Sequence, residues 1–316
     1  MQTITLGSQG PTVTALGIGT WAWGDRLFWS YGKTFGENEV AEAFQAAVES
    51  GITFFDTAEV YGFGESERLL GRFCQQTHQS IQIATKYFPL PWRWHRDDIT
   101  KALTASLERL QMSEICLYQI HWPLEFILKT QDFMEVLAGE VKKGRIQAVG
   151  VSNYSAEQMS LAHRYLAEKG IPLAVNQVPY SLITRQIEDN GILARSRELG
   201  VTILAYSPLA QGLLTGKYTP ANYQELQGAR RLDPRFSPQG LTKLAPLFAE
   251  LNRLGEKYGK TPAQVSLNWL IAQGNVIPIP GAKTAEQAKQ NAGALGWSLT
   301  PEEVDGLREM SQRVTQ

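Results

Sequence analysis

The chain has 316 residues, with 30 basic and 31 acidic side chains and a net charge of −1. No apolar run approaches the roughly 18 residues of a membrane-spanning helix, and no block of basic residues indicates a nucleic-acid partner. The first residues lack the basic and apolar regions of a secretory signal, and two cysteines provide no disulfide framework. We therefore expect a cytoplasmic globular protein without a membrane, nucleic-acid or obligatory protein partner.

Short runs of apolar and β-branched residues alternate with segments whose apolar residues recur every three or four positions. The predicted strands are residues 16–21, 53–57, 81–86, 116–121, 148–153, 173–178, 202–207 and 276–281. The predicted helices are 38–50, 65–75, 97–110, 132–143, 156–168, 189–198, 243–258, 262–272 and 285–294. Such alternation is typical of parallel strands joined by right-handed helical crossovers, and eight repeats close a barrel. The sequence therefore predicts the α/β class and a (β/α)8 TIM barrel.

Two segments interrupt this alternation. Residues 22–37 and 208–240 are long, irregular and follow predicted strands, which is where barrel enzymes carry functional loops. Residues 4–14 read as a hairpin that caps the bottom of the barrel. Residues 301–313 read as a final helix capped by Thr300. Because no linker-like change of composition occurs, we expect one domain over residues 1–316.

The predicted strand ends carry ionisable side chains. Asp56, Lys86 and His121 end three strands, and Tyr61 lies close to the first of them. A tyrosine with a pKa near 10 is a poor proton donor at neutral pH, and a neighbouring ammonium is expected to lower that value. A carboxylate would hold the ammonium, and a neutral histidine would orient a carbonyl oxygen. These residue types suit protonation of an oxygen as hydride, which no side chain can supply, reaches its carbon.

Six motifs in order carry a resemblance that covers most of the chain. They are Gly51-Ile-Thr-Phe-Phe-Asp-Thr-Ala-Glu-Val-Tyr-Gly62, Ala84-Thr-Lys-Tyr87, Tyr118-Gln-Ile-His-Trp122, Gly150-Val-Ser-Asn153, Ala205-Tyr-Ser-Pro-Leu209 and Ile279-Pro-Gly-Ala-Lys283. The chain resembles the aldo-keto reductase superfamily, in the branch of bacterial and plant enzymes and potassium-channel β-subunits. The resemblance implies a barrel that binds NADPH without a Rossmann domain. It also implies Tyr61 as the general acid, with Asp56, Lys86 and His121 completing a tetrad.

The same resemblance implies the residues that hold the cofactor. Ser152, Asn153 and Gln177 would bind the nicotinamide carboxamide, and Tyr206 would stack on the ring. The remaining expected contacts are Gly19, Thr20, Trp21, Asp56, Ser207, Pro208, Leu209, Gly212, Lys217, Arg231, Gly281, Lys283, Gln287, Gln290 and Asn291. The chain departs from better-known reductases at the ribose 2′-phosphate, where Gly281-Ala282 replaces a Lys-Ser pair. Lys283, with Arg230 or Arg231, is the expected substitute.

Other interpretations of these residues stay open at this stage. Tyr206 could be a core aromatic, Lys283 a solvated cation, and Trp23 and Trp122 either substrate contacts or packing residues. The leading function is reduction of an aldehyde or ketone, with pyridoxal a specific possibility suggested by similar plant enzymes. The alternative is a slow-turnover NADPH-binding regulatory subunit that senses redox state. A barrel hydrolase would need a second acid beside Asp56, and Glu59 and Glu65 are the nearest candidates.

Overall fold

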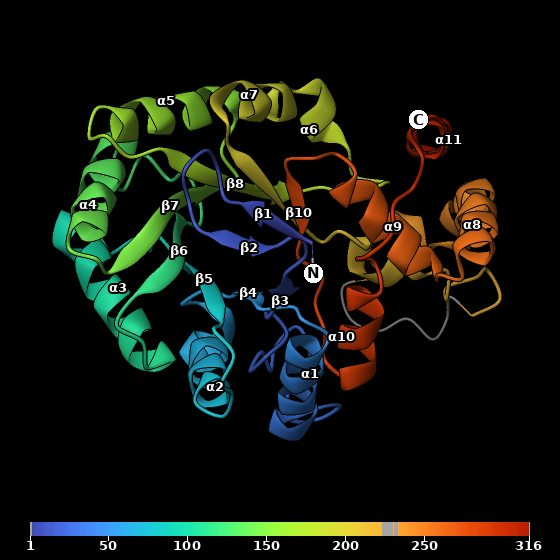
Figure 1. Cartoon of the computed structure of the whole chain (residues 1–316), viewed down its shortest axis with the longest axis horizontal. Coiled ribbons are helices and arrows are strands. Elements are labelled where there is room, and N and C mark those ends of the chain that lie inside the picture. The colour runs from blue at the N-terminus through green and yellow to red at the C-terminus, as the bar shows by residue number, and fades with distance from the viewer. Residues whose placement is uncertain (1, 223–229, 231–232, 316) are drawn as a thin grey trace.

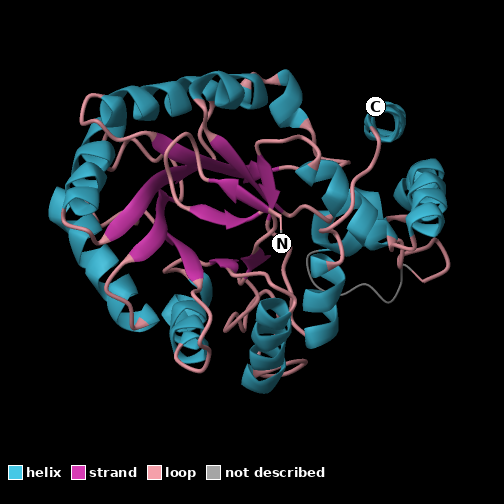
Figure 2. Cartoon of the chain, viewed as in Figure 1, coloured by secondary structure: helices cyan, strands magenta, loops and turns pink. Residues whose placement is uncertain are grey.

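The computed structural model describes residues 2–222, 230 and 233–315. Eight parallel strands, β3 to β10, pair in chain order and lie inside a ring of helices, as Figures 1 and 2 show. The strands are β3 (Ile18–Gly19), β4 (Phe54–Asp56), β5 (Gln82–Tyr87), β6 (Ile115–Ile120), β7 (Ile146–Ser152), β8 (Leu173–Pro179), β9 (Thr202–Tyr206) and β10 (Val276–Pro278). A parallel bridge between Gly19 and Gly281 joins the first strand to the last. The predicted (β/α)8 barrel is confirmed.

The central strands are buried and mostly apolar on both faces because helices cover the outside and side chains fill the inside. All six residues of β6 are buried. The predicted first and last strands are shortened to two and three residues. Pro278 and Pro280 have no N–H to donate, so pairing there runs only through their carbonyls. Gly19 N donates to the Pro280 carbonyl over 3.0 Å, which holds the seam closed.

The N-terminal hairpin caps the bottom of the barrel, as expected. Its strands β1 (Thr3–Thr5) and β2 (Thr12–Thr14) are antiparallel. Leu6 and Val13 are buried in a cluster with interior strand residues such as Phe54 and Leu204. The Gly7 N–H donates to Thr202 Oγ1 over 2.8 Å, where β9 begins. The open end of the barrel is therefore the opposite one, at the carboxyl ends of the strands.

The helices form the outer ring (Figure 2). They are α1 (Glu37–Glu49), α2 (Glu65–Cys74), α3 (Arg96–Leu110), α4 (Thr130–Lys142), α5 (Ala156–Ala167), α6 (Gln186–Asp189), α7 (Ile192–Leu199), α8 (Pro238–Tyr258), α9 (Pro262–Ile271), α10 (Ala285–Ala292) and α11 (Pro301–Thr315). Helix α1 illustrates their logic: Val40, Phe44 and Ala47 repeat at helical spacing and are all buried. Gly51, with φ of +83°, follows its end and turns the chain inward.

Two helix predictions are wrong in detail. The helix expected over 189–198 is divided into α6 and α7, because Gly191 has a φ of +83° and breaks the helix there. Helix α8 begins at Pro238 and not at residue 243, since Ser237 Oγ caps it by accepting from Gly240 N over 3.1 Å. The irregular segment after β9 is therefore shorter than expected, and it contains the 3-10 turns Ala210–Thr215 and Pro234–Phe236.

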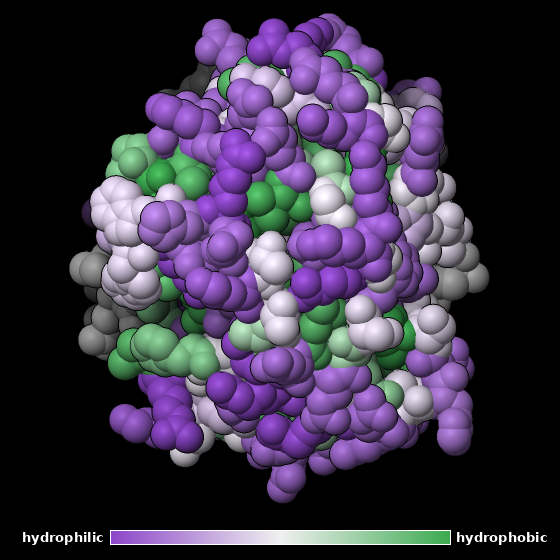
Figure 3. All heavy atoms as spheres, turned by 90° about the vertical axis from the view of Figure 1, so that its left-hand side faces the viewer, coloured by the Kyte–Doolittle hydropathy of each residue, from purple (hydrophilic) through white to green (hydrophobic). Residues whose placement is uncertain are grey.

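One side of the helical ring has a mostly polar surface. The face at the left of Figure 1, where α3 and α4 lie, is covered mostly by hydrophilic residues, with small separate apolar patches (Figure 3). Within residues 2–222 and 233–315, the structure contains no helix long and apolar enough to cross a membrane.

Candidate active site

The carboxyl ends of the strands surround a cavity of about 840 Å³. Asp56 ends β4, Lys86 lies on β5, and His121 directly follows β6. Tyr61 begins a short 3-10 turn (Tyr61–Gly64) in the loop after β4. Asp56, Tyr61 and His121 line the cavity, while Lys86 lies behind them with no exposed surface. The four predicted tetrad residues are thus brought together from three strands and one loop.

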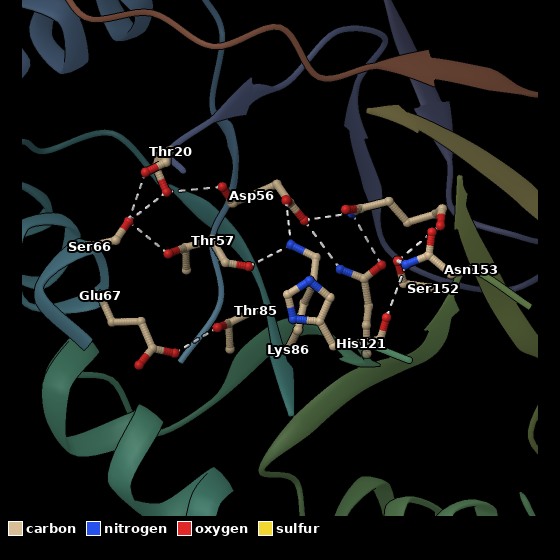
Figure 4. Close-up of polar contacts among 12 residues, drawn as sticks. Thr20, Asp56, Thr57, Ser66, Glu67, Thr85, Lys86, His121, Ser152 and Asn153 are labelled. Atoms are coloured by element: carbon tan, nitrogen blue, oxygen red, sulfur yellow. Dashed lines mark hydrogen bonds and ion pairs between the residues drawn. The ribbon is translucent and has the colours of Figure 1, made fainter. Parts of the chain in front are cut away.

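Lys86 and Asp56 form a buried ion pair. Lys86 Nζ donates to Asp56 Oδ1 over 2.5 Å and to the Thr57 carbonyl over 2.7 Å (Figure 4). Burial lowers the pKa of Lys86, whereas the charge and hydrogen bond of Asp56 raise it. Asp56 Oδ2 accepts from Gln177 Nε2 over 2.8 Å and from Gln119 Nε2 over 3.2 Å. Both carboxylate oxygens are occupied, so the ammonium has a fixed position.

Tyr61 lies next to this pair. Lys86 Nζ is 5.1 Å from the centroid of its ring. The expectation that the ammonium lowers the pKa of Tyr61 is wrong for this structure, because burial first and then the Asp56 charge raise it. The main reason is burial, because the phenolate would lose its hydration, and the nearby Asp56 carboxylate adds to the increase. Tyr61 is therefore held as the neutral phenol, the form that can give up a proton.

His121 faces Tyr61 across the cavity floor. Its ring centroid lies 5.9 Å from that of Tyr61, with the rings nearly perpendicular. Burial and, secondarily, Lys86 lower the pKa of His121 to about 3. Its Nδ1 is buried without a hydrogen-bond partner among the residues that the structure describes. At neutral pH the imidazole is uncharged, with one nitrogen able to donate and the other to accept.

A layer of hydroxyl groups supports the tetrad from behind (Figure 4). Ser66, at the start of α2, contacts Thr20 Oγ1 over 2.8 Å and accepts from Thr57 Oγ1 over 2.9 Å. Thr85 Oγ1 donates to the buried Glu67 over 2.6 Å. These bonds tie the ends of β3, β4 and β5 to one helix. The carboxyl ends that carry the tetrad are thereby held in register.

Nearly all of the predicted cofactor contacts meet at this cavity. Those that line it are Gly19, Thr20, Trp21, Asp56, Ser152, Asn153, Gln177, Tyr206, Ser207, Pro208, Leu209, Gly212, Lys217, Gly281, Lys283, Gln287, Gln290 and Asn291. Arg231 lies outside the described residues. Its neighbour Arg230 lines the cavity.

The polar wall beside the tetrad suits an amide-bearing ring. Tyr206 Oη donates to Asn153 Oδ1 over 3.1 Å, which fixes the tyrosine ring at the cavity surface. Asn153, Ser207 and Gln211 have φ values of +63°, +50° and +57°. Such strained backbone is uncommon outside glycine and concentrates at binding sites. These features fit a nicotinamide cofactor held by Ser152, Asn153 and Tyr206.

The far end of the cavity gathers cations. Lys217, Arg230 and Lys283 line it together. Lys283 Nζ lies 4.3 Å from the centroid of Trp29, and the Arg230 guanidinium lies 5.7 Å from the same ring. Burial, Arg230 and Lys217 lower the pKa of Lys283 to about 8. Burial and the neighbouring cations disfavour the charged form of Lys283, and a bound anion would favour it again. This end of the cavity therefore fits the phosphates of a dinucleotide.

Sequence reasoning missed Gln119, which donates to Asp56 Oδ2 and accepts from Gln177 Nε2 over 3.3 Å. A signal was present: Gln119 precedes His121 by two positions on a strand, so both face the same side. A polar residue on that face needs a partner.

Trp23 was expected to contact substrate, and the structure contradicts this. Trp23 has no exposed surface, and its indole N–H donates to the Ala282 carbonyl over 2.7 Å. The chain turns after β3, with Trp23 N donating to the Thr20 carbonyl, and this directs the side chain into the core against Phe55.

The aromatic wall consists of other residues. Trp21 and Trp122 line the cavity and are 39% and 42% exposed. Trp21 lies 6.4 Å from Tyr61, centroid to centroid. These two rings are placed to contact a substrate at Tyr61.

The carboxylates that a hydrolase would need are engaged elsewhere. Glu59 is paired with Arg93 and Glu65 with Arg72. Neither acid is among the described residues lining the cavity. The described part of the chain also holds no group of acidic, histidine or cysteine side chains arranged for a metal ion.

Comparisons with known proteins identify the family of this chain. A sequence profile for the Aldo/keto reductase family matches residues 15–312. The chloroplastic pyridoxal reductase of Arabidopsis thaliana is 40% identical over 308 residues, spanning 93% of this chain and 82% of that protein. The crystallised glycerol dehydrogenase of Gluconobacter oxydans has a TM-score of 0.86 at 31% identity, covering 99% of this chain and 96% of that one.

A second solved structure carries a nucleotide. An aldo/keto reductase from Klebsiella pneumoniae, crystallised with NADP and acetate, is 28% identical with a TM-score of 0.75, covering 97% of this chain and 94% of that one. The barrel, the cavity and these matches together show that the chain is an oxidoreductase of the aldo/keto reductase family.

Proposed function

We propose that this chain reduces an aldehyde or ketone to the alcohol with NADPH, using Tyr61 as the proton donor. The observation that carries the proposal is that Tyr61 and His121 line one cavity while the Lys86–Asp56 pair lies directly behind them. This combination joins a neutral phenol, a neutral imidazole and a fixed ammonium at one point. It is suited to stabilising an oxygen that gains negative charge.

The residues divide the work as follows. His121, uncharged because its pKa is lowered to about 3, donates an N–H to the carbonyl oxygen and orients it. Tyr61 Oη then transfers its proton to the same oxygen. Lys86 stabilises the phenolate that is left, and Asp56 keeps Lys86 charged. NADPH, when bound, supplies the hydride that reaches the carbonyl carbon.

We assign NADPH binding to the part of the cavity that runs from the wall beside Tyr61 to the end that gathers the cations. Ser152, Asn153 and Tyr206 would hold the nicotinamide near Tyr61. Lys217, Arg230 and Lys283 would neutralise its phosphates. Because the Gly281-Ala282 segment offers no cation, Lys283 becomes the main determinant of a preference for NADPH over NADH.

The substrate class that we propose is a small aromatic or apolar aldehyde, with pyridoxal as the first compound to test. Trp21 and Trp122 supply exposed aromatic faces at the cavity. The relationship to the Arabidopsis pyridoxal reductase, at 40% identity over most of both chains, supports the choice.

A single assay tests the proposal. Purified protein is mixed with NADPH or NADH and a panel of carbonyl compounds that includes pyridoxal, benzaldehyde and short alkanals, and nicotinamide absorbance is followed. We expect turnover with NADPH, slower turnover with NADH, and no effect of a chelator. Tight NADPH binding without turnover on any aldehyde would favour the regulatory alternative and overturn the proposed reductase.

A further inference from the structure

A second buried ion pair lies on the substrate side of the tetrad. Glu59, whose side chain is 6% exposed, pairs with Arg93, whose side chain is 21% exposed. Arg93 Nη1 donates to Glu59 Oε1 over 2.5 Å, and Arg93 Nη2 donates to Glu59 Oε2 over 3.0 Å. This two-pronged geometry is the most directional form of an ion pair.

The pair is fastened to the loop that follows β5. Glu59 Oε1 also accepts from Phe88 N over 2.6 Å, and Arg93 Nη1 donates to the Phe88 carbonyl over 3.0 Å. Both backbone polar groups of Phe88 are therefore bonded to the two charged side chains. The backbone of Phe88 has little freedom to move while the pair is intact.

Phe88 in turn fixes one side of the catalytic histidine. Its ring lies 5.4 Å from the His121 ring, centroid to centroid, with the planes at 77°. The preceding residue, Tyr87, accepts a backbone hydrogen bond from His121 N over 2.9 Å. Through these two contacts, a shift of the loop after β5 is transmitted to His121.

The other end of the pair is close to the proton donor. Glu59 lies two residues before Tyr61, in the loop after β4, and Glu59 N donates to the Lys86 carbonyl over 3.3 Å. The Tyr61 and His121 rings meet at 5.9 Å on the far side. Glu59, Phe88, His121 and Tyr61 thus form a closed circuit of contacts that joins the loops after β4, β5 and β6.

From this circuit we infer that the Glu59–Arg93 pair is a positioning device that sets the distance between Tyr61 and His121. The inference rests on the proposed function, because it gives those two residues their roles. Neither charged group lines the cavity, so neither touches substrate. Their effect is on the rate of the chemical step, since a displacement of about 1 Å between reacting groups costs on the order of 100-fold in rate.

The molecule offers a matched control at the opposite end of the barrel. Glu140, 1% exposed, pairs with Arg145, 24% exposed, over 3.1 Å. Arg145 directly precedes β7, at the end of the strands remote from the cavity. Glu140 also pairs with Lys143 over 2.9 Å. Removing one member of either pair takes a partner from a largely buried charge and destabilises the fold, but only the Glu59–Arg93 pair is linked to the tetrad.

The test compares the variants Glu59→Gln, Arg93→Gln, Glu59→Gln/Arg93→Gln and Glu140→Gln. For each, unfolding midpoint, NADPH dissociation constant, and kcat and KM per NADPH-binding site are measured with the best aldehyde. We expect both single changes at the Glu59–Arg93 pair to lower kcat roughly 10- to 100-fold, with the NADPH dissociation constant within about twofold. The double variant should regain thermal stability without regaining kcat, whereas Glu140→Gln should lose stability and keep kcat.

If the single variants fold poorly, a chemical rescue experiment provides a second test. Arg93→Ala is assayed with and without guanidinium at sub-denaturing concentration, beside Arg145→Ala. Recovery of kcat in Arg93→Ala alone supports the positioning role. Unchanged kcat in the Glu59 and Arg93 variants, or an equal loss in Glu140→Gln, overturns it. If Tyr61→Phe loses activity and Glu59→Gln does not, only this inference fails; if Tyr61→Phe stays active, the proposed function fails first.

Discussion

The ammonium of Lys86 and the carboxylate of Asp56 lie 2.5 Å apart, with 0% and 3% of their side chains exposed. Burial lowers the pKa of Lys86 and Asp56 opposes that change, so the carboxylate favours the charged form of Lys86. Removing one member of a buried ion pair leaves an unpaired buried charge and lowers the free energy of unfolding strongly. Removing both members together lowers it much less. This dependence gives the site a stability signature as well as a kinetic one.

Lys86→Met should therefore destabilise the protein by about 3–5 kcal/mol, because it leaves Asp56 buried without its cation. Asp56→Asn combined with Lys86→Met should cost less than the sum of the two single changes. Urea unfolding of the wild type, both single variants and the double variant measures the coupling. Strict additivity would show that the two side chains do not depend on each other.

His121 should show its low pKa in the pH dependence of stability. Its pKa is about 3 in the folded protein against an ordinary value of 6.5. Between these values the unfolded chain binds a proton at His121 that the folded chain does not, so the free energy of unfolding rises with pH. The free energy of unfolding therefore has its full value above pH 6.5, the ordinary pKa. It decreases as the pH falls from there toward about 3, the pKa of His121 in the folded protein.

Replacing His121 by Gln should flatten that part of the profile. The measurement is the difference in unfolding free energy between wild type and variant, followed by urea titration at several acidic pH values. A difference that does not change with pH would mean that His121 is protonated at its ordinary pKa. The imidazole would then gain a proton just below neutral pH, and burial would not hold it in the neutral form that the mechanism needs.

Lys283 should set the affinity for the phosphorylated cofactor. Lys283→Met is expected to weaken NADPH binding by about 10- to 100-fold and to change NADH binding little, because a charge-assisted hydrogen bond to phosphate is lost. The control is Lys289→Met, which removes an exposed cation of α10, the helix that begins just after Lys283, and this cation does not line the cavity. Fluorescence titration with both nucleotides measures the effect.

The pH dependence of this binding has a definite sign. Since the pKa of Lys283 is lowered to about 8, wild-type affinity for NADPH should fall as the pH rises through that value. A phosphate that binds there will raise this pKa, so the fall begins near the pKa of the free protein and ends near the higher pKa of the complex. Lys283→Met should lack the dependence, and an unchanged profile in the variant would assign it to another group.

The architecture was predictable because the spacing of apolar residues along the chain differs between strands and helices. Alternating strand and helix periods gave eight repeats, and parallel strands such as β6 are buried throughout and mostly apolar. Local breaks were harder to predict. The division of α6 from α7 depends on the backbone conformation at Gly191, and the start of α8 depends on the cap at Ser237. Predicting either feature requires the backbone conformation at these residues, which the pattern of apolar residues does not give.

The positions of site residues at strand ends could be predicted from the sequence. The positions of residues in loops were harder to predict. Asp56, Lys86 and His121 follow from strand ends at one mouth. Trp23 was misplaced because a turn after β3, and not residue type, decides that it points into the core. The raised pKa of Tyr61 also needed the structure, since it depends first on how deeply the phenol is buried and then on how close the Asp56 carboxylate lies.

The most direct test of the account is the rate of NADPH oxidation by Tyr61→Phe, measured with an aldehyde that the wild type reduces. NADPH binding is titrated on the same preparation. The account predicts a loss of about 100- to 10,000-fold in kcat with the dissociation constant for NADPH unchanged, because only the transferable proton is removed. A variant that binds NADPH and reduces the aldehyde within a few-fold of the wild-type rate would contradict it.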